Sequence, residues 1–598
     1  LPIIFIKGIV GVLFKELGLV IIFVLLASLF CALLFTPMLS GQLLRPLNVA
    51  VEEKFSRFHR WFVRTEAWFD ALSSRYVRTL SWALQHRAWT IGGGVLIFLL
   101  SMMLFLVIKT EFLPEMDQGN VQGTIEMPVG TRMEVTDAML RHVEEYMRNN
   151  VPESDVYLTR SGTSPFAGIG LAFGQEQGSN YARIVAHLIP KRQRKRSDKQ
   201  IAHDLSEKIM QLPGVRSVDF TQADPFSSAM VGGKPISVEI YGYDLTETDS
   251  LAQRVKRILQ GIRGTMDITI SRKMGQPELW IEIDRQKASR LGLNVAAISS
   301  AIRTLMFGAN ASYYRERGQE YDIWVQLNEA SRSTLNDLKQ LQLVTPLGKT
   351  VSLASIANFH EAKGPVELHR KDQERVVRVE CGIYGRALGE VAKELRQKLA
   401  GLYVPPGYEI KLSGAIEQQA TAFHTLLYAL VMGALLVYLV MAAQFESLID
   451  PFVIMFSIPF AIVGVAWALF LTGTSLNVNS FVGMVMLVGI VVNNAIVLVD
   501  YTNIVRRRGV DLIPAVLEAG KTRLRPVMMT AFTTIFGLLP LALSRAEGSE
   551  MWVPLGVSVI GGLLVSTLVT LIFVPTLYTV FELRLKGKSL FRQIRETL

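Results

Sequence analysis

The chain has 598 residues, of which half are hydrophobic and only 19% are charged, and its mean hydropathy is +0.31. Soluble domains usually carry about a quarter charged residues, and disordered chains are poor in apolar residues. The composition therefore excludes an ordinary soluble enzyme and an intrinsically disordered chain. The two cysteines, Cys31 and Cys381, are too few for a disulfide scaffold or a multi-cysteine metal framework.

Seven apolar stretches have about the 20 residues that a helix needs to cross a bilayer. They cover residues 17–38, 88–108, 425–443, 451–473, 481–500, 526–543 and 552–581. Lys and Arg are concentrated at 40–87, at 501–525 and in the tail at 583–598. Alternating spans place these three segments on one side, which the positive-inside rule makes the cytoplasm. The net charge of +10 then reflects membrane topology, and nucleic acid is not an expected partner.

The segment 40–87 combines Arg with aromatic residues at helical spacing. This pattern is typical of an amphipathic helix that lies on the inner membrane surface and contacts membrane lipid. We expect this helix to act as an anchor, and a lipid-specific regulatory role is the alternative.

The block 110–423 contains alternating strand-like and helix-like runs, which predict two small split-βαβ α+β subdomains outside the membrane. The first is predicted from strands at 121–129, 155–160, 181–189 and 215–222 and from helices at 134–149 and 198–211. The second is predicted from strands at 236–242, 278–284, 376–385 and 408–414 and from helices at 247–262 and 387–401. The segment 286–372 interrupts the second subdomain and contains Gly and Pro turns, so we interpret it as an inserted subdomain.

No motif of enzyme chemistry occurs in the sequence. The eight histidines show no metal-ligand spacing, and neither a Walker A motif nor a GxSxG motif is present. The chain is therefore not expected to be an enzyme. The basic run KRQRKR at 191–196 is expected to be a solvated surface turn, with a partner-binding patch as the alternative.

Two adjacent asparagines, Asn493 and Asn494, lie near the middle of the predicted span 481–500, where polar groups are costly. They either hydrogen-bond to neighbouring helices as packing groups or face an ionisable partner in a proton path. Arg523 and Thr530 are two helical turns apart, so they share one face of the next helix. No Asp or Glu lies deep in a predicted span, so the chain has no obvious intramembrane carboxylate of its own.

Five motifs in the sequence resemble those of the resistance–nodulation–division (RND) transporters. The runs LVGIVVNNAIVLVDYTN (487–503) and RLRPVMMTAFTTIFGLLPLAL (523–543) carry the resemblance most clearly. FESLIDPFVIMFSIPFAIVGV (445–465), FLPEMDQG (112–119) and LFTPML (34–39) match the same family. The branch looks like the hydrophobe/amphiphile (multidrug) efflux pumps of Gram-negative inner membranes, and the chain resembles the C-terminal half of such a pump.

The resemblance implies a polytopic α-helical membrane protein with a large periplasmic α+β region, made of split-βαβ porter subdomains and an inserted docking subdomain. It implies the following order: the end of the first membrane repeat at 1–39, a cytoplasmic amphipathic region at 40–87, a span at 88–109, porter subdomain 1 at 110–230, porter subdomain 2 at 231–285 and 373–423, the docking subdomain at 286–372, five spans at 424–582 and a cytoplasmic tail at 583–598.

The implied function is proton-driven export of lipophilic or amphiphilic compounds from the inner membrane. The implied partners are two further subunits in a trimer, a periplasmic adaptor (membrane fusion) protein and an outer-membrane channel. The proton-motive force supplies the energy, and no cofactor is expected. Two alternatives stay open: a heavy-metal RND exporter, and a non-transporting RND-like assembly or translocase-accessory protein.

The resemblance also implies site residues. For the proton relay these are Asn493, Asn494, Arg523 and Thr530. The family's best-known drug pumps have Lys at the position of Asn493. This chain therefore lacks a cation that would hold a carboxylate ionised. The residues that the resemblance implies for contact with the transported substrate are Phe166 and Phe173 on the Gly-rich loop 161–180, and Tyr157 and Val185 on flanking strands.

Overall fold

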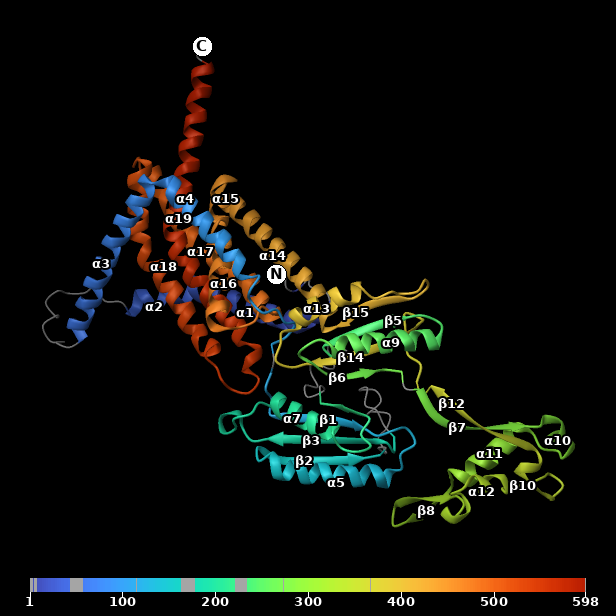
Figure 1. Cartoon of the computed structure of the whole chain (residues 1–598). Helices are drawn as coiled ribbons and strands as arrows, with labels where there is room; N and C mark the ends of the chain where they lie inside the picture. The colour runs from blue at the N-terminus through green and yellow to red at the C-terminus, as the bar shows by residue number, and fades with distance from the viewer. Residues whose placement is uncertain are drawn as a thin grey trace. The chain divides into compact units, whose positions relative to one another are not determined.

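A computed structural model of the chain describes residues 4, 8–43, 58–114, 116–162, 178–220, 234–272, 274–365 and 367–596 (Figure 1). The chain divides into two compact units. The first unit combines a helical bundle with two α/β subdomains and comprises Leu1–Pro128, Arg132–Ser271 and Arg370–Leu598. The second comprises Val129–Thr131 and Arg272–His369.

Seven helical segments among the described residues are long and apolar enough to cross a membrane, and each corresponds to one predicted stretch. They are Gly11–Leu43, Arg87–Leu104, Ala415–Phe445, Ile449–Thr472, Val478–Arg507, Leu512–Ala542 and Ser549–Arg584. Their helices are α1 (Ile9–Phe30), the π-helix η2 (Cys31–Phe35), α2 (Thr36–Leu43), α4 (Arg87–Leu104), α14 (Ala415–Phe445), α15 (Ile449–Met455), α16 (Ser457–Thr472), α17 (Val478–Arg507), α18 (Leu512–Ala542), the 3-10 turn η7 (Ser549–Met551) and α19 (Val553–Glu596).

Helix α19 is the centre of the bundle, because α16, α17 and α18 all pack against it (Figure 1). Glycines allow the closest of these approaches. A Cβ atom at Gly464 of α16 would lie 2.3 Å from the carbonyl oxygen of Gly561 and 2.8 Å from Cα of Gly562, both on α19. Small residues at helix interfaces let two backbones approach closely, so these glycines set the distance between α16 and α19.

The predicted amphipathic segment forms helix α3 (Phe58–Gln85). The second half of α3 is fixed to the bundle: Leu80 is fully buried, and the Tyr76 hydroxyl donates a hydrogen bond to the Leu571 carbonyl of α19 at 2.8 Å. The guanidinium of Arg525 on α18 lies 5.7 Å from the centre of the Phe69 ring. Contacts with α18 and α19 thus hold this helix in place.

The first α/β subdomain is an antiparallel sheet with strand order β2-β3-β1-β4 and two helices on one face. Its elements are β1 (Asn120–Glu126), α5 (Met133–Asn150), β2 (Ser154–Ser161), β3 (Tyr181–Leu188), the 3-10 turn η4 (Lys191–Gln193), α7 (Asp198–Met210) and β4 (Ser217–Asp219). Alternate strand residues such as Val121, Ile125 and Ile184 are buried against the apolar faces of the helices. The other strand residues point to the opposite face, because side chains alternate along a strand.

The second α/β subdomain has strand order β13-β14-β5-β15, with β6 also paired to β14. Its elements are β5 (Ile236–Tyr241), α9 (Leu245–Gln260), β6 (Thr265–Ile270), β13 (Arg370–Lys371), β14 (Glu374–Ile383), α13 (Leu388–Ala400) and β15 (Glu409–Gly414). The strand expected here at 278–284 lies instead in β7, and the short strand β6 takes its place in the sheet. The alternating pattern indicated a strand at 278–284 correctly, but it carried no information about the partner strand.

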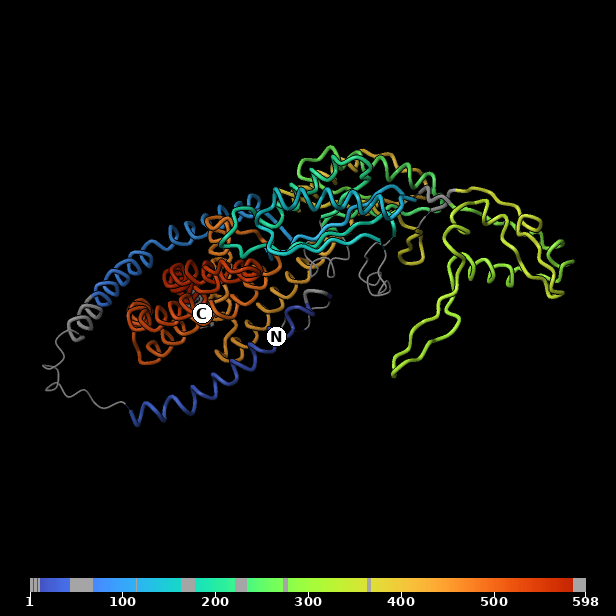
Figure 2. The backbone as a smooth tube through the Cα atoms, turned by 90° about the horizontal axis from the view of Figure 1, so that it is seen from below, coloured from blue at the N-terminus to red at the C-terminus, as the bar shows by residue number. Residues whose placement is uncertain are grey.

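The longer segment of the second unit runs from Arg272 to His369. It contains β7 (Met274–Ile283), α10 (Arg285–Arg290), α11 (Val295–Met306), β8 (Ala309–Glu316), β9 (Gln319–Val325), η5 (Glu329–Ser331), α12 (Leu335–Lys339), β10 (Gln342–Val344), β11 (Thr350–Ser352), η6 (Leu353–Ser355) and β12 (Ala357–Pro365). Strands β7 and β12 pair along their length. Figure 2 shows the β8–β9 hairpin projecting from the rest of this unit, and almost every residue of the hairpin is exposed.

Candidate functional site

The bundle contains a hydrogen-bonded group of three polar side chains, Asn494 of α17, Thr530 of α18 and Thr567 of α19. Asn494 is only 7% exposed. Its Nδ2 donates to Thr567 Oγ1 at 3.3 Å, and its Oδ1 accepts from Thr530 Oγ1 at 3.3 Å. A buried amide among apolar helices is stable only when it is hydrogen-bonded. Asn494 therefore joins three helices at one point, and we call these three residues the polar triad.

The polar triad has spare hydrogen-bonding capacity. An asparagine amide offers two donor hydrogens and two acceptor lone pairs, and Asn494 uses one of each within the triad. The Thr530 hydroxyl has a single hydrogen and a second acceptor within reach, the Val527 carbonyl at 3.0 Å. The Thr530 hydroxyl can therefore exchange acceptors. The triad can bond to a further polar group without losing its link to α19.

The other two predicted relay residues, Asn493 and Arg523, lie outside the polar triad. Asn493 is rotated by about 100° from Asn494 around the helix, and its exposed side chain makes no hydrogen bond within the described part of the chain. The Arg523 guanidinium lies 4.5 Å above the Tyr501 ring. Arg523 and Thr530 do share a helix face, but two turns, about 11 Å, separate them. The structure thus brings together Asn494 and Thr530 and places Asn493 and Arg523 elsewhere.

A polar network near the start of α15 and the end of α17 escaped the sequence reasoning. Asn503 donates to Asp450 Oδ2 at 3.0 Å and accepts from the Tyr578 hydroxyl at 2.6 Å. Arg506 donates to the Tyr578 hydroxyl at 2.7 Å and to Glu582 at 2.6 Å. The signal in the sequence was the spacing of these residues. Asn503 is three residues from Arg506, and Tyr578 is four residues from Glu582, so each pair shares a helix face. The network ties α15, α17 and α19 together at one end.

The predicted substrate residues of the first α/β subdomain do not meet at one surface. Tyr157 packs against the helix-covered core. Val185 lies on the other face of the sheet, where Leu158 is its cross-strand partner. Phe166 and Phe173 lie outside the described residues. Tyr157 and Val185 therefore cannot line a single pocket from the same face of this sheet.

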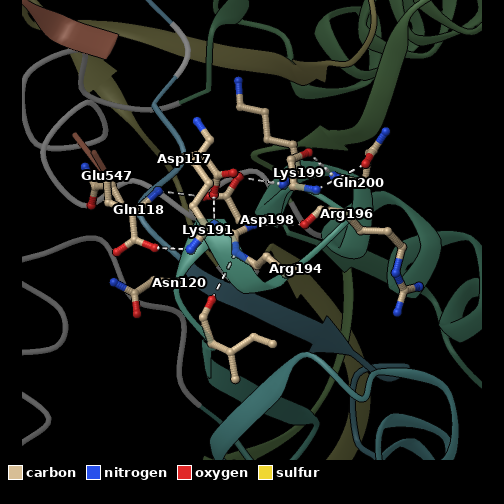
Figure 3. Close-up of polar contacts among 12 residues, drawn as sticks. Asp117, Gln118, Asn120, Lys191, Arg194, Arg196, Asp198, Lys199, Gln200 and Glu547 are labelled. Atoms are coloured by element: carbon tan, nitrogen blue, oxygen red, sulfur yellow. Dashed lines mark hydrogen bonds and ion pairs between the residues drawn. The ribbon is translucent and has the colours of Figure 1, made fainter. Parts of the chain in front are cut away.

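A buried ionic cluster joins the segment before β1 to the start of α7 (Figure 3). Arg194 forms an ion pair with Asp117, and Asp198 accepts hydrogen bonds from the backbone N–H groups of Gln118 at 3.0 Å and Lys199 at 2.7 Å. Burial acts to raise the pKa of Asp117, but the bonded guanidinium of Arg194 outweighs it and lowers that pKa. Burial and the neighbouring charge of Asp117 raise the pKa of Asp198 to about 6. One carboxylate of the pair thus keeps its charge while the other protonates near neutral pH.

The basic run 191–196 is a solvated turn only in part, because Arg192, Gln193 and Lys195 are exposed while Arg194 is buried. The Arg194 side chain is 1% exposed. Arg196 donates two hydrogen bonds to Glu153, at 2.9 and 2.6 Å, and this contact lowers the pKa of Glu153. Lys195 does lie exposed. Acidic partners far away in the sequence bury part of the run, and composition alone cannot identify such partners.

The described part of the chain holds no group of three or more His, Cys, Asp or Glu side chains that could bind a metal ion. Cys381 is fully buried in β14, and burial raises the pKa of its thiol to about 12. Only a thiolate is an effective metal ligand, so Cys381 is inert in this respect. Cys31 lies exposed on η2.

Comparison with known proteins agrees with this architecture. The model of the AcrB/AcrD/AcrF family matches residues 1–582. The chain belongs to this RND family. The predicted family is thereby confirmed, and the bundle with its α/β subdomains is the RND transporter fold.

Two curated relatives are similar over almost all of this RND chain. The cation efflux system protein CzcA of Alcaligenes sp. (strain CT14) and the cobalt-zinc-cadmium resistance protein CzcA of Cupriavidus metallidurans are each 27% identical over 590 residues. The match covers 97% of this chain but 54% of each relative, so the chain spans about half the length of these relatives.

Solved structures show the same likeness. Two crystal forms of a heavy metal efflux pump match with TM-scores of 0.74 and 0.72 and identities of 28% and 27%. Each match covers 86% of this chain and about half of the solved chain, 51% and 52%. The names of the relatives and of these structures refer to cation efflux, cobalt-zinc-cadmium resistance and heavy metal efflux, so they do not support the multidrug branch that we expected from the sequence.

Proposed function

We propose that this RND chain is part of an inner-membrane pump that exports divalent heavy-metal cations. The observation that carries the proposal is the agreement between the comparisons. Two relatives, one named for cation efflux and one for cobalt-zinc-cadmium resistance, match 97% of the chain, and two crystal forms of a heavy metal efflux pump match 86% of it. The seven long apolar helices support a polytopic membrane protein. The concentration of Lys and Arg at 40–87 and 501–525 supports a cytoplasmic location for those segments.

The polar triad supports coupling of this pump to the proton-motive force. A carboxylate that faced Asn494 or Thr530 would find hydrogen-bond groups on two helices, and its protonation would change which of them donate. Such a change alters the packing of α17 against α18. In this proposal the carboxylate comes from outside the described residues, and the triad senses its charge.

The two α/β subdomains act as porter subdomains of the proposed pump, and the second unit acts as its docking subdomain. The exposed β8–β9 hairpin offers free backbone edges and large apolar side chains, among them Tyr313, Tyr321 and Trp324. Such a surface is typical of a protein–protein contact. We propose that the pump works as a trimer, with a periplasmic adaptor protein and an outer-membrane channel.

Amphiphile export is the second candidate, and one observation favours it. The described residues supply no group of three metal-binding side chains, whereas a pathway for amphiphiles needs no such ligands. A metal-exporting pump would have to bind its cargo through residues outside the described set, or through fewer ligands supplemented by water.

Metal tolerance tests the proposal. The complete reading frame, produced with its adaptor in a Gram-negative host that lacks its own RND exporters, should raise the tolerated concentrations of Zn²⁺, Co²⁺ and Cd²⁺ several-fold. A protonophore should abolish the effect. Raised tolerance to ethidium without any change in metal tolerance would move the pump to the second candidate.

A further inference from the structure

One residue of the first α/β subdomain, Lys191, binds two carboxylates on the connection between α18 and α19. The Lys191 backbone N–H donates to Glu547 Oε1 at 2.7 Å (Figure 3), and its ammonium group forms an ion pair with Glu550. Glu550 lies in the 3-10 turn η7 that leads into α19. The two partners are more than 350 residues from Lys191 in the sequence, so the contact is purely tertiary.

The turn that carries Lys191 is firmly attached to the sheet of its own subdomain. The buried Arg194 guanidinium donates to the Ile189 carbonyl at 3.2 Å and pairs with Asp117, just before β1. Asp198, at the start of α7, accepts a hydrogen bond from the backbone next to Asp117. Figure 3 shows these groups converging around the turn. A displacement of Lys191 is therefore passed on to both β1 and α7.

On the other side of the contact, the two carboxylates belong to the connection between the helices that flank Asn494. Helix α18 supplies Thr530 of the polar triad, and α19 supplies Thr567. The side-chain amide of Asn479, near the start of α17, donates to the Met551 carbonyl at the end of η7. A movement of α18 relative to α17 and α19 must therefore displace the connection that Lys191 binds.

The ion pair is too weak to be required for folding. The Lys191 side chain is 38% exposed and that of Glu550 is 22% exposed. Ion pairs with such access to water contribute little to stability, because water screens the charges and ordering the side chains costs entropy. Loss of the pair should leave the fold intact, and an effect on activity would then report coupling between the parts.

We propose that Lys191 is a positioning residue that transmits movement of α18 and α19 to the first α/β subdomain, an inference that rests on the proposed transport function. The carboxylates of Glu547 and Glu550 hold the turn of Lys191 against the connection. When the polar triad rearranges and α18 shifts, the turn follows, and the sheet and α7 move with it.

Charge reversal tests the inference in the complete pump. Lys191→Glu and Glu550→Lys should each lower the maximal export rate at least five-fold, with an unchanged cargo concentration for half-maximal export. The double variant Lys191→Glu/Glu550→Lys restores the opposite charges and should recover at least half of the wild-type rate. Lys195→Glu is the matched control, since it makes the same charge change on an exposed residue of the same run, and it should export at the wild-type rate. Zn²⁺ is the first cargo and ethidium the second.

The outcomes separate the two proposals. Wild-type rates for Lys191→Glu and Glu550→Lys, or a double variant no better than the single ones, would overturn the role of Lys191 while leaving the transport function in place. A wild-type pump that exports neither Zn²⁺ nor ethidium would overturn the transport function, and this inference with it. Comparable amounts of each variant in the membrane and unchanged elution in gel filtration establish that folding is preserved.

Discussion

Replacement of Gly464 by alanine should weaken the contact between α16 and α19. The added Cβ would lie 2.3 Å from the Gly561 carbonyl oxygen and 2.8 Å from both Gly562 Cα and Val565 Cβ. Ordinary contacts begin at 3.4 Å, so α16 would have to withdraw by roughly 1 Å, because the backbone of α19 cannot turn aside as a flexible side chain would. Overpacking of this kind costs about 1–3 kcal/mol.

A gain in helix propensity opposes this cost. Alanine is better than glycine in a helix interior by about 1 kcal/mol, so we expect a net loss of about 0–2 kcal/mol for Gly464→Ala and a difference of about 1–3 kcal/mol from a site where the added methyl group meets nothing. Gly92→Ala in α4 is the matched control, because no described atom lies within 4 Å of its added Cβ. The control should show the gain alone.

Thermal unfolding of the purified protein in detergent, followed by far-ultraviolet circular dichroism, measures both variants. Gly464→Ala should lower the midpoint by a few degrees, and Gly92→Ala should leave it unchanged or raise it. Equal midpoints for the two variants would refute the claim that glycines set the distance between α16 and α19.

Two further predictions concern the polar residues. Asn494→Leu should abolish proton-coupled export and cost about 1 kcal/mol of stability, since two interhelical hydrogen bonds of about 0.6 kcal/mol each are lost; Asn493→Leu should export normally, and equal export by both would reduce Asn494 to a packing group. In the first α/β subdomain, the folded-state pKa of Asp198, about 6, exceeds its ordinary value of 3.8. The stability that its protonation supplies is therefore fully present below about pH 3.8 and is lost as the pH rises through 6. Asp198→Asn cannot ionise, so denaturant titrations at pH 5 and 7.5 should show a smaller loss for the variant, by about 1.4 kcal/mol, because only the one pH unit between 5 and the folded-state pKa contributes; parallel losses would contradict the assignment.

Much of the fold follows from the sequence because its signals are local. Twenty-residue apolar runs identify the long helices, and the alternation in YARIVAHLI predicts strand β3 nearly to its ends. The predictions from sequence fail where residues far apart in the chain determine which strands pair and which side chains are buried. The segment 278–284 is a strand, as predicted, but its partner is β12 and not a strand of the second α/β subdomain. The run 191–196 is basic, but Arg194 pairs with Asp117 and Arg196 pairs with Glu153. These distant partners withdraw the two arginines from water to different degrees.

The candidate site shows the same division. The sequence identifies Asn493 and Asn494 as unusual, but α17 is apolar on most of its faces, so no pattern tells which asparagine faces the neighbouring helices. The hydrogen bonds to Thr530 and Thr567 show that Asn494 is the asparagine that faces the neighbouring helices. The alternation of side chains along a strand places Tyr157 and Val185 on opposite faces of the sheet, and a contact of either residue with cargo stays a prediction.

Direct transport by the complete pump tests the central claim. The purified protein would be reconstituted into liposomes with an imposed proton gradient and loaded in parallel with Zn²⁺ and with ethidium, each followed by its fluorescence signal. The account predicts movement of Zn²⁺ that stops when the gradient is collapsed and that Asn494→Leu abolishes. Movement of ethidium without movement of Zn²⁺, or Zn²⁺ movement that persists without a gradient, would contradict it.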